Sequence, residues 1–270
     1  MIQFNIFPGG VRRVVTFSYD DGNDKDERLI EMFNRYGVKG TFHLNGRRFI
    51  GKTEEELDIY RKRYEGHEIS CHTVNHGWLD KMPVVSIINE VMEDRRILEH
   101  LAGYPVVGMS YPSGAFDGIS VDVLRSCGIV YSRTTRPAQP AHEFPEDYLT
   151  WHPTCHHKHD IMTKLETFKN PPRRVPNLML FYVWGHSYEF NNDDNWDLIE
   201  NFCREASGLD DVWYATNIEI YDYICALRAL RFSVDCSVVY NPSAIPVWFT
   251  ANGNTVKVGA GETLKIGENV

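Results

Sequence analysis

The chain has 270 residues, of which 43% are hydrophobic and 24% are charged, so it has ordinary globular composition and enough length to bury a full core. Its formal net charge of −9 argues against nucleic acid and against an anionic membrane surface as partners. Neutral or cationic small molecules and neutral polymers stay open, and no apolar stretch is long enough to span a bilayer.

Cysteine usage and the first residues favour a cytoplasmic location. The six cysteines lie far apart and form no C-x-x-C pair, which is typical of reduced thiols rather than of a disulfide framework or a thiolate zinc site. The opening residues, MIQFNIFPGGVRR, lack the basic-then-apolar order of a secretory signal. We therefore expect a cytoplasmic protein, and the sequence leaves its oligomeric state open.

In chain order, short apolar runs alternate with amphipathic helical segments. Strands are predicted at 13–19, 40–45, 67–72, 106–111, 129–133, 178–185 and 212–216. Helices are predicted at 26–37, 53–66, 85–103, 120–128, 195–208 and 216–230. About seven strand-then-helix units with near-continuous apolar strands predict a parallel sheet covered by helices, either open or closed as a barrel.

The sequence changes character near residue 233. From there apolar and polar residues alternate between the turn signals ANGN and GAGE, a pattern that predicts a small antiparallel β appendage. The predicted domains are therefore residues 1–232, which carry the α/β unit, and residues 233–270.

Two adjacent carboxylates, Asp20 and Asp21, end the first predicted strand in the stretch TFSYDDG. The carboxyl ends of parallel strands are where α/β proteins place their chemistry. Taken alone, an Asp-Asp-Gly after a strand is more often a turn or a helix cap. The repulsion between the two charges is relieved if one carboxylate binds a cation and the other stays free beside it as a general base.

A pair of histidines, His72 and His76, follows another predicted strand in the stretch GHEISCHTVNHGWL. On a helical turn, residues four apart share a face, so both imidazoles could reach one point. Two imidazoles and one carboxylate are a common ligand set for a catalytic divalent ion with a position left open. Such a spacing occurs by chance in many proteins, but together with the Asp pair it favours metal binding.

These motifs together resemble a known family. TFSYDDG and HTVNH resemble the first two motifs of the polysaccharide deacetylases with NodB homology, carbohydrate esterase family 4, and SYPSG and LFYVWGHS resemble two later ones. The resemblance implies a deformed (β/α)7-type barrel, a divalent metal and hydrolysis of N- or O-acetyl groups on sugars. The ion is usually zinc, with cobalt, nickel or manganese as alternatives.

Residue by residue, the resemblance implies a division of roles. Asp20 would be the general base, Asp21, His72 and His76 would bind the metal, and His186 would be the general acid. Further candidates come from the motifs and their flanks. They are the backbone N–H of Tyr111 as an oxyanion donor, and Pro112, Trp151 and Tyr188 as substrate contacts.

The sequence also departs from the family pattern. Ser18 and Tyr19 stand as extra residues before the Asp pair, and Ser110 occupies the place of an arginine that would orient the base. Without that guanidinium the pKa of Asp20 should be higher. Arg133 or Arg136 could substitute, and we prefer Arg133.

Other histidines are expected to be structural. His43 should be a hydrogen-bonded core residue, and a second metal site is the less favoured reading of the cluster in WHPTCHHKH, which we expect to be solvated imidazoles. That cluster comprises His152, His156, His157 and His159.

The preferred interpretation is a metal-dependent hydrolase that removes acetyl groups from N-acetylated sugars or glycans. One alternative is an amidohydrolase of a small non-sugar amide or cyclic imide on the same barrel. The other is a catalytically silent carbohydrate-binding protein.

Overall fold

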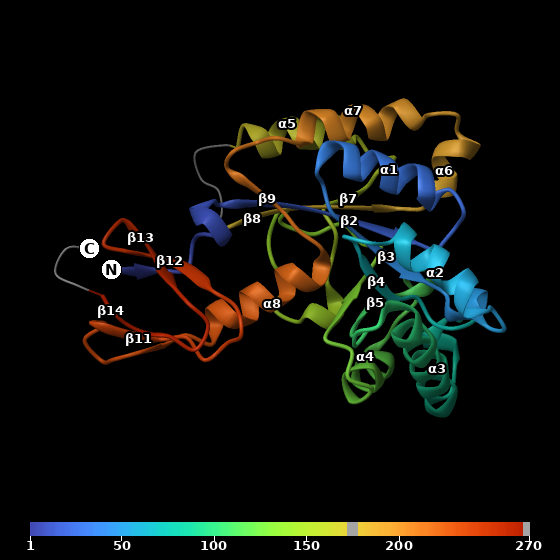
Figure 1. Cartoon of the computed structure of the whole chain (residues 1–270), viewed down its shortest axis with the longest axis horizontal. Helices are drawn as coiled ribbons and strands as arrows, with labels where there is room; N and C mark the ends of the chain where they lie inside the picture. Colours follow the sequence, from blue (N-terminus) through green and yellow to red (C-terminus); the bar gives the residue numbers. More distant parts are fainter. Residues whose placement is uncertain (172–177, 267–270) are drawn as a thin grey trace.

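A sheet of parallel strands forms the centre of the molecule in the computed structural model (Figure 1), which describes residues 1–171 and 178–266. Its strand order is β6-β5-β4-β3-β2-β8-β7, and β9 pairs with the first half of β2. The bounds are β2 (Arg13–Asp20), β3 (Gly40–Leu44), β4 (Glu68–Cys71), β5 (Gly108–Ser110), β6 (Tyr131–Arg133), β7 (Cys155–His156), β8 (Met179–Gly185) and β9 (Val212–Tyr214). The predicted parallel α/β architecture is confirmed as a half-barrel; its sheet has eight strands, since β7 joins the seven that were predicted.

Helices connect these strands. They are α1 (Asp26–Tyr36), α2 (Glu54–Arg63), α3 (Val84–Ala102), α4 (Gly118–Ser126), α5 (Ile161–Lys169), α6 (Ser187–Asn192), α7 (Trp196–Ala206) and α8 (Asn217–Arg228). Of these, α1, α5 and α7 cover one face of the sheet (Figure 1), whereas the start of α8 contacts Thr16 and Tyr182, which point to the inside of the half-barrel. Helix α2 begins with a capping box in which Thr53 and Glu56 satisfy each other's backbone N–H groups. Helix α1 ends at Gly37, whose φ of 65° is favourable for glycine.

Alternation along β2 separates the core from the polar interior. Phe17 and Tyr19 are fully buried in the apolar cluster between the sheet and its helices. Ser18 and Asp20 point the other way, because successive side chains of a strand alternate. The family-like opening motif therefore sends its polar residues toward the inside of the half-barrel.

Strand register brings the expected site residues to one edge. Asp20 lies opposite His43 of β3, and Tyr19 lies opposite Gly185 of β8, so His186 follows at the level of Asp20. On the other side, Ser110 of β5 lies opposite Arg133 of β6. The carboxyl ends of β2, β3, β5, β6 and β8 thus converge at Asp20 and Asp21.

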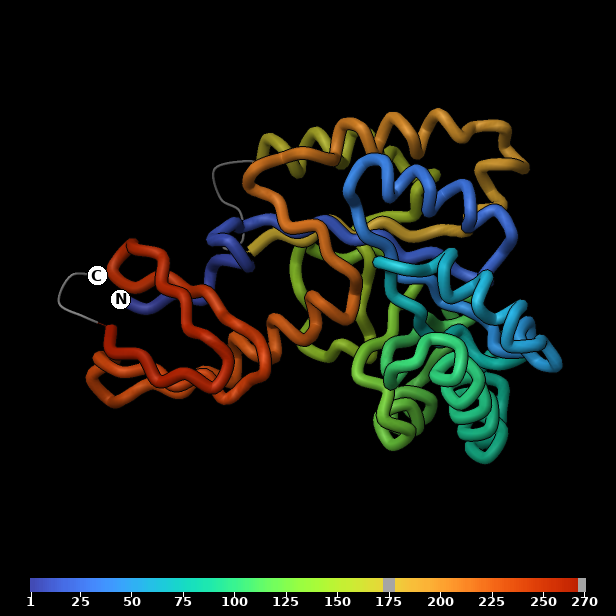
Figure 2. Tube along the Cα trace, viewed as in Figure 1, coloured from blue at the N-terminus to red at the C-terminus, as the bar shows by residue number. Residues whose placement is uncertain are grey.

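The C-terminal segment forms two small antiparallel sheets beside the half-barrel (Figure 2). Their strands are β1 (Ile2–Gln3), β12 (Val247–Ala251) and β13 (Asn254–Val258) in one, and β10 (Arg231–Phe232), β11 (Val238–Tyr240) and β14 (Thr263–Lys265) in the other. Two of these strands precede residue 233, so the appendage also recruits the start of the chain. The boundary at 232/233 stays a prediction, and residues 267–270 lie outside the described part.

A second apolar cluster joins the appendage to the half-barrel. Phe7 contacts Tyr223 of α8 with ring centroids 5.8 Å apart, and Phe249 of β12 is buried in the same cluster. Burial of aromatic side chains at such a contact fixes the two parts against each other. All six cysteines are free thiols. Within residues 1–171 and 178–266, no helix is long and apolar enough to cross a membrane.

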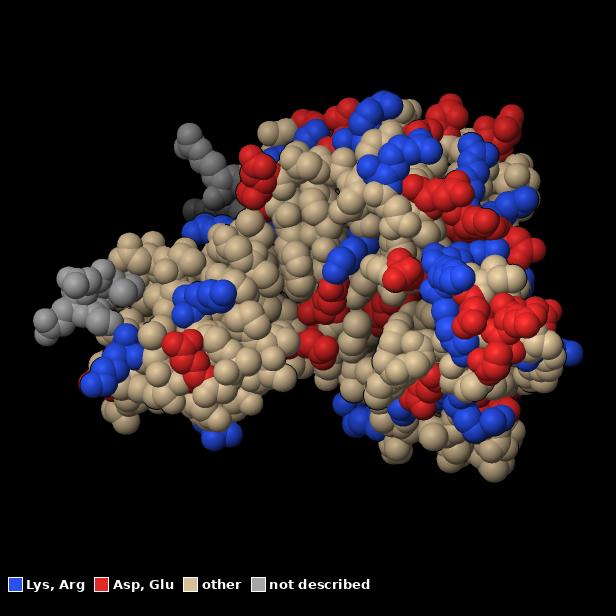
Figure 3. Space-filling model, viewed as in Figure 1, with Lys and Arg blue, Asp and Glu red and all other residues tan. Residues whose placement is uncertain are grey.

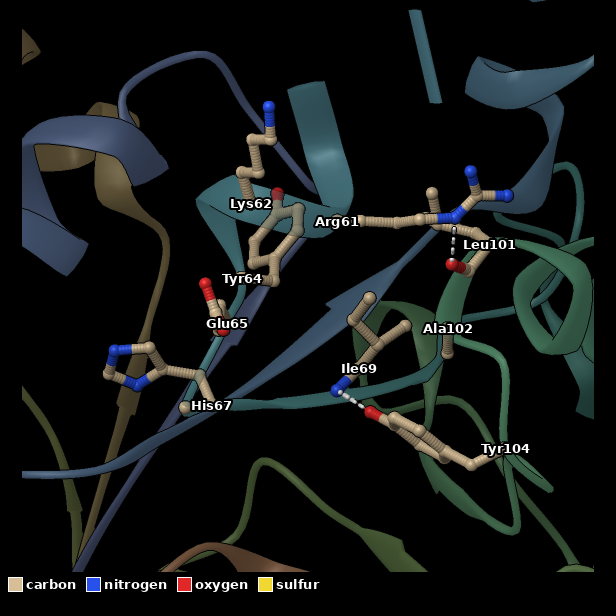
Figure 4. Close-up of a pocket in the computed structure, with 10 residues that line it drawn as sticks. Arg61, Lys62, Tyr64, Glu65, His67, Ile69, Leu101, Ala102 and Tyr104 are labelled. Carbon is tan, nitrogen blue, oxygen red and sulfur yellow. Dashed lines mark hydrogen bonds between the residues drawn. The ribbon is translucent and has the colours of Figure 1, made fainter. Parts of the chain in front are cut away.

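Acidic and basic side chains are interspersed on the face of the half-barrel that Figure 3 shows. One pocket lies between α2, α3 and the amino end of β4, where Ile69 N–H donates to the Tyr104 hydroxyl over 2.8 Å and Arg61 Nε donates to the carbonyl of Leu101 over 3.0 Å (Figure 4). It lies at the end of β4 opposite to His72, away from the edge where α/β proteins place their chemistry.

Candidate active site

Three donor atoms converge at the carboxyl ends of β2 and β4. Asp21 Oδ1 lies 3.6 Å from His72 Nε2 and 3.6 Å from His76 Nε2, and the two imidazole centroids are 4.9 Å apart. Donors bound to one tetrahedral zinc ion are about 3.4 Å from each other. The donor set and its spacing therefore fit a divalent cation.

Left-handed backbone conformations occur at two of the three donor residues and beside the third. Asp21 and His76 have φ of 76° and 58°, and Thr73, which follows His72, has φ of 60°. Left-handed conformations cost non-glycine residues about 1 kcal/mol or more, so they persist where the surroundings impose them. The expected helical turn between His72 and His76 is wrong, because His76 reaches its position through this left-handed loop rather than through helical spacing.

The loop is held by helix α3. Glu90 accepts hydrogen bonds from the N–H of Asn75 (2.9 Å) and from its side-chain amide (2.8 Å). Asp94, which is fully buried, accepts the N–H of His72 at 2.9 Å and that of Gly46 at 2.6 Å. Burial raises the pKa of Asp94 to about 8. These contacts fix the end of β4 in place independently of any cation.

Asp20 lies beside the three donors and is held by two groups. Ser110 Oγ donates to Asp20 Oδ1 over 3.0 Å, and the buried guanidinium of Arg133 forms an ion pair with Asp20 Oδ2. Burial by itself would raise the pKa of Asp20, but Arg133 and then His72 outweigh it and hold that pKa well below its usual range. The prediction of a higher pKa is therefore wrong, because the charge lost at position 110 is supplied from the adjacent strand.

Ser18 holds Arg133 in that position. Arg133 Nε donates to Ser18 Oγ over 3.0 Å, and Ser18 Oγ lies 2.8 Å from His43 Nε2. The other ring nitrogen of His43 lies 3.3 Å from the carbonyl of Cys71, an acceptor only, so Nδ1 carries the proton and Nε2 accepts from Ser18. His43 is thus the hydrogen-bonded core residue that the sequence predicted. Both departures from the family pattern are therefore linked: the extra residue Ser18 holds Arg133, which replaces the arginine missing at position 110.

Ser110 also fixes the orientation of His72. Its hydroxyl proton goes to Asp20, so its oxygen accepts from His72 Nδ1, 2.7 Å away, and the Ser110 carbonyl lies 2.9 Å from the same nitrogen. A proton on Nδ1 leaves the lone pair of His72 on Nε2, facing Asp21. The Ser110 hydroxyl thereby links Asp20 to His72, a candidate metal ligand, through two hydrogen bonds.

His186 enters from the end of β8 as the residue before α6. Its Nε2 lies 3.9 Å from Asp21 Oδ2, and its Nδ1 lies 3.0 Å from Glu189 Oε2. Burial lowers the pKa of His186, but the hydrogen bond that it donates to Glu189 and the charges of the Asp pair outweigh burial, so the pKa is raised. Glu189 was not predicted, although its place three residues after His186 matches capping-box spacing.

Two aromatic residues complete this side of the site. The Tyr188 ring lies 5.1 Å from that of His186, and the Asp21 charge contributes to raising the pKa of Tyr188 to about 12, after burial. The Trp184 ring packs over the Arg133 guanidinium, 4.4 Å from its central carbon. Trp184 was also missed, because the apolar run of β8 gives no sign of which of its residues reach the site.

Three predicted contacts are contradicted by the structure. The N–H of Tyr111 donates to the carbonyl of Arg133 over 3.0 Å, so it is not free for an oxyanion. Trp151 has no exposed surface and packs between Tyr131 and Tyr182, so it is a core residue rather than a wall for a sugar. Pro112 is buried as well, so it is not an open contact surface for a substrate.

The expectation of solvated imidazoles in the 152–159 segment is also wrong in part. His157 is 1% exposed, and His156 Nε2 lies 3.1 Å from Glu189 Oε2. Strand β7, which ends at His156, pairs with β8 and places His156 beside His186, with their ring centroids 6.3 Å apart. His159 is exposed, as expected.

Comparison with known proteins agrees with the geometry. Residues 9–132 match the family model described as polysaccharide deacetylase. A peptidoglycan-N-acetylglucosamine deacetylase of Bacillus cereus is 32% identical over 94 residues, which are 33% of this chain and 32% of that protein. The chain thus spans about a third of that curated relative's length.

Solved structures share the fold at low sequence identity. A proposed polysaccharide deacetylase from Mycobacterium smegmatis superposes with a TM-score of 0.62 at 17% identity, covering 82% of this chain and 93% of the other. The Puue allantoinase gives a TM-score of 0.62 at 13% identity, covering 80% and 91%. The resemblance seen in the motifs is therefore confirmed: residues 9–132 match the polysaccharide deacetylase model, and the solved structures share the fold.

Proposed function

We propose that this protein is a metal-dependent hydrolase that removes acetyl groups from N-acetylated sugars or glycans. The observation that carries the proposal is the convergence of Asp21, His72 and His76 on one point, with Asp20 and His186 beside it. The family match and the deacetylase named among its relatives support the substrate class.

Asp21, His72 and His76 would hold the cation, for which we propose zinc. Their two imidazole nitrogens and one carboxylate oxygen are the donor types of catalytic zinc sites. When bound, the ion would supply Lewis-acid polarisation of an acyl carbonyl and make a water molecule more acidic.

Asp20 is proposed as the general base. Arg133 and Ser110 occupy defined positions on its two oxygens and keep it ionised at neutral pH. Its Oδ2 lies 3.9 Å from His72 Nε2, so the carboxylate borders the cation site without belonging to it. An ionised carboxylate in that place can accept a proton from an attacking water.

His186 is proposed as the general acid. Glu189 Oε2 accepts from Nδ1, which directs Nε2 toward Asp21 and favours the doubly protonated imidazolium. The Nε2 proton is then available to the departing amine, after which His186 returns to the neutral Nδ1–H form. A deprotonated carboxylate, Asp20, and a protonated imidazole, His186, thus flank the site, as acid–base catalysis of amide hydrolysis requires.

Acetate release from N-acetylglucosamine oligomers tests the proposal. The zinc-loaded protein should release acetate, and Asp20→Asn should lower kcat by at least about a hundredfold while it retains the metal. Unchanged turnover by Asp20→Asn would refute the base assignment. Hydrolysis of a cyclic imide without acetate release from any acetylated sugar would favour the amidohydrolase alternative, and no hydrolysis at all would favour the silent carbohydrate-binding protein.

A further inference from the structure

A second group of donor atoms lies next to the proposed site. His156 Nε2 and His186 Nδ1 are 3.1 and 3.0 Å from the same atom, Glu189 Oε2. The three donor atoms lie within 4.8 Å of one another, which is close enough to surround one cation. His186 and Glu189 lie at the start of α6 and His156 lies in β7, so the pairing of β7 with β8 brings His156 to the other two.

The carboxylate oxygen at the centre of this group faces more nitrogen atoms than it has lone pairs. The backbone N–H of His186 already donates to Glu189 Oε2 over 3.0 Å, and His157 Nε2 lies 3.5 Å away. One carboxylate oxygen offers about two acceptor positions. A cation would replace the two competing imidazole contacts by coordinate bonds and leave the backbone hydrogen bond in place.

His157 provides an independent sign that the group is incomplete. Its side chain is 1% exposed, and among the described residues neither of its ring nitrogens has a hydrogen-bond partner. Buried polar atoms are nearly always paired, so an orphaned imidazole aimed at the same oxygen needs an explanation. A cation at the centre of the group would give its Nε2 a partner after a small movement.

Lys158 limits the affinity of this second group for a cation. Its ammonium lies 3.0 Å from Glu189 Oε1 and 2.7 Å from Asp193 Oδ2, so it occupies the other carboxylate oxygen and not Oε2, which faces the imidazoles. The positive charge nearby weakens binding of a second cation through repulsion. This site should therefore be weaker than that of Asp21, His72 and His76.

We propose that His156, His186 and Glu189 form a second, inhibitory site for a divalent cation such as zinc. The inhibitory effect rests on the proposed role of His186 as the general acid. A cation and a proton cannot both occupy Nδ1 of His186, so the occupied site removes the imidazolium. Excess zinc would then stop turnover while the first cation stays in place.

Metal counting tests the site without reference to activity. Chelator-treated protein is titrated with zinc, and bound equivalents are determined by competition with a chromophoric chelator. The wild-type protein should bind two equivalents, the second more weakly. His156→Ala and the larger His156→Gln should weaken the second by at least tenfold and leave the first unchanged. His159→Ala, an exposed neighbouring histidine, should change neither.

Activity is measured in the same titration. Acetate release by the wild-type protein should fall as the second equivalent binds, whereas the His156 variants, each normalised to its own rate at one equivalent, should resist zinc to at least tenfold higher concentration. Binding of one equivalent only, or a second equivalent unaffected in both His156 variants, would overturn the proposal. A protein that releases no acetate but loses its second equivalent in these variants would refute the proposed function and leave the second site standing.

Discussion

Removal of the Arg133 guanidinium should destabilise the protein in a pH-dependent way. Arg133 is fully buried and forms an ion pair with the equally buried Asp20. Arg133→Met keeps most of the side-chain volume and leaves the carboxylate without its counter-charge. Breaking a buried pair from one side costs about 3–5 kcal/mol, which is a large share of the ~5–15 kcal/mol that stabilises a typical domain.

The pH dependence follows from the sign of the pKa shift. The pKa of Asp20 is depressed in the folded wild-type protein, so its contribution to stability is present above the unfolded pKa and is lost as pH falls through the folded pKa. Arg133→Met removes the charge that lowers the pKa of Asp20 most. Burial then has the larger effect, so the pKa of Asp20 in the folded variant rises above its unfolded value. The loss should then be greatest at pH 7 and smaller at pH 5, where protonation relieves the buried charge.

Urea unfolding of metal-free protein at the two pH values measures the effect. The double variant Asp20→Asn/Arg133→Met should recover much of the lost stability, since it leaves no buried charge unpaired. Arg136→Met is the matched control, because Arg136 is exposed and should change stability by less than about 0.5 kcal/mol. A loss below about 1 kcal/mol in Arg133→Met, or an equal loss at both pH values, would refute the reasoning.

Three further changes test individual contacts. Ser110→Ala removes the hydroxyl between Asp20 and His72, so zinc affinity at the first site should fall by about tenfold in a chelator competition, with Ser110→Thr close to the wild type. Glu189→Gln removes the charge that raises the pKa of His186, so the alkaline limb of the kcat profile should move to lower pH; an unmoved limb would contradict the acid assignment. Trp151→Ala should cost about 3–5 kcal/mol in urea unfolding, as a core residue does, and a loss below about 1 kcal/mol would contradict its placement.

Much of the fold could be predicted because local patterns determine it. The apolar run that ends at Asp20 gives a buried parallel strand, and the paired histidines follow a second such strand, so both motifs must reach the same edge of an α/β sheet. The spacing of His72 and His76 correctly predicted that both imidazoles reach one point, but the predicted helical turn between them is wrong. His76 has a left-handed conformation, which contacts of its loop with α3 impose rather than its own sequence.

The parts that could not be predicted depend on contacts between strands. Arg133 was a guess from its position after a strand, and only the register of β5 with β6 and the contact with Ser18 show how it reaches Asp20. The sequence around Trp151 and Trp184 does not show which of the two reaches the site. Trp151 lies in the core, and Trp184 packs over Arg133. Glu189 was missed because its contacts form only when the pairing of β7 with β8 brings His156 beside His186.

The account depends most on the cation site of Asp21, His72 and His76. Its direct test is a crystal structure of the protein reconstituted with one equivalent of zinc, with anomalous diffraction recorded at the zinc absorption edge. The account predicts one strong anomalous peak about 2.0–2.2 Å from Asp21 Oδ1, His72 Nε2 and His76 Nε2. No peak among these three atoms, with the zinc bound elsewhere or not at all, would contradict it.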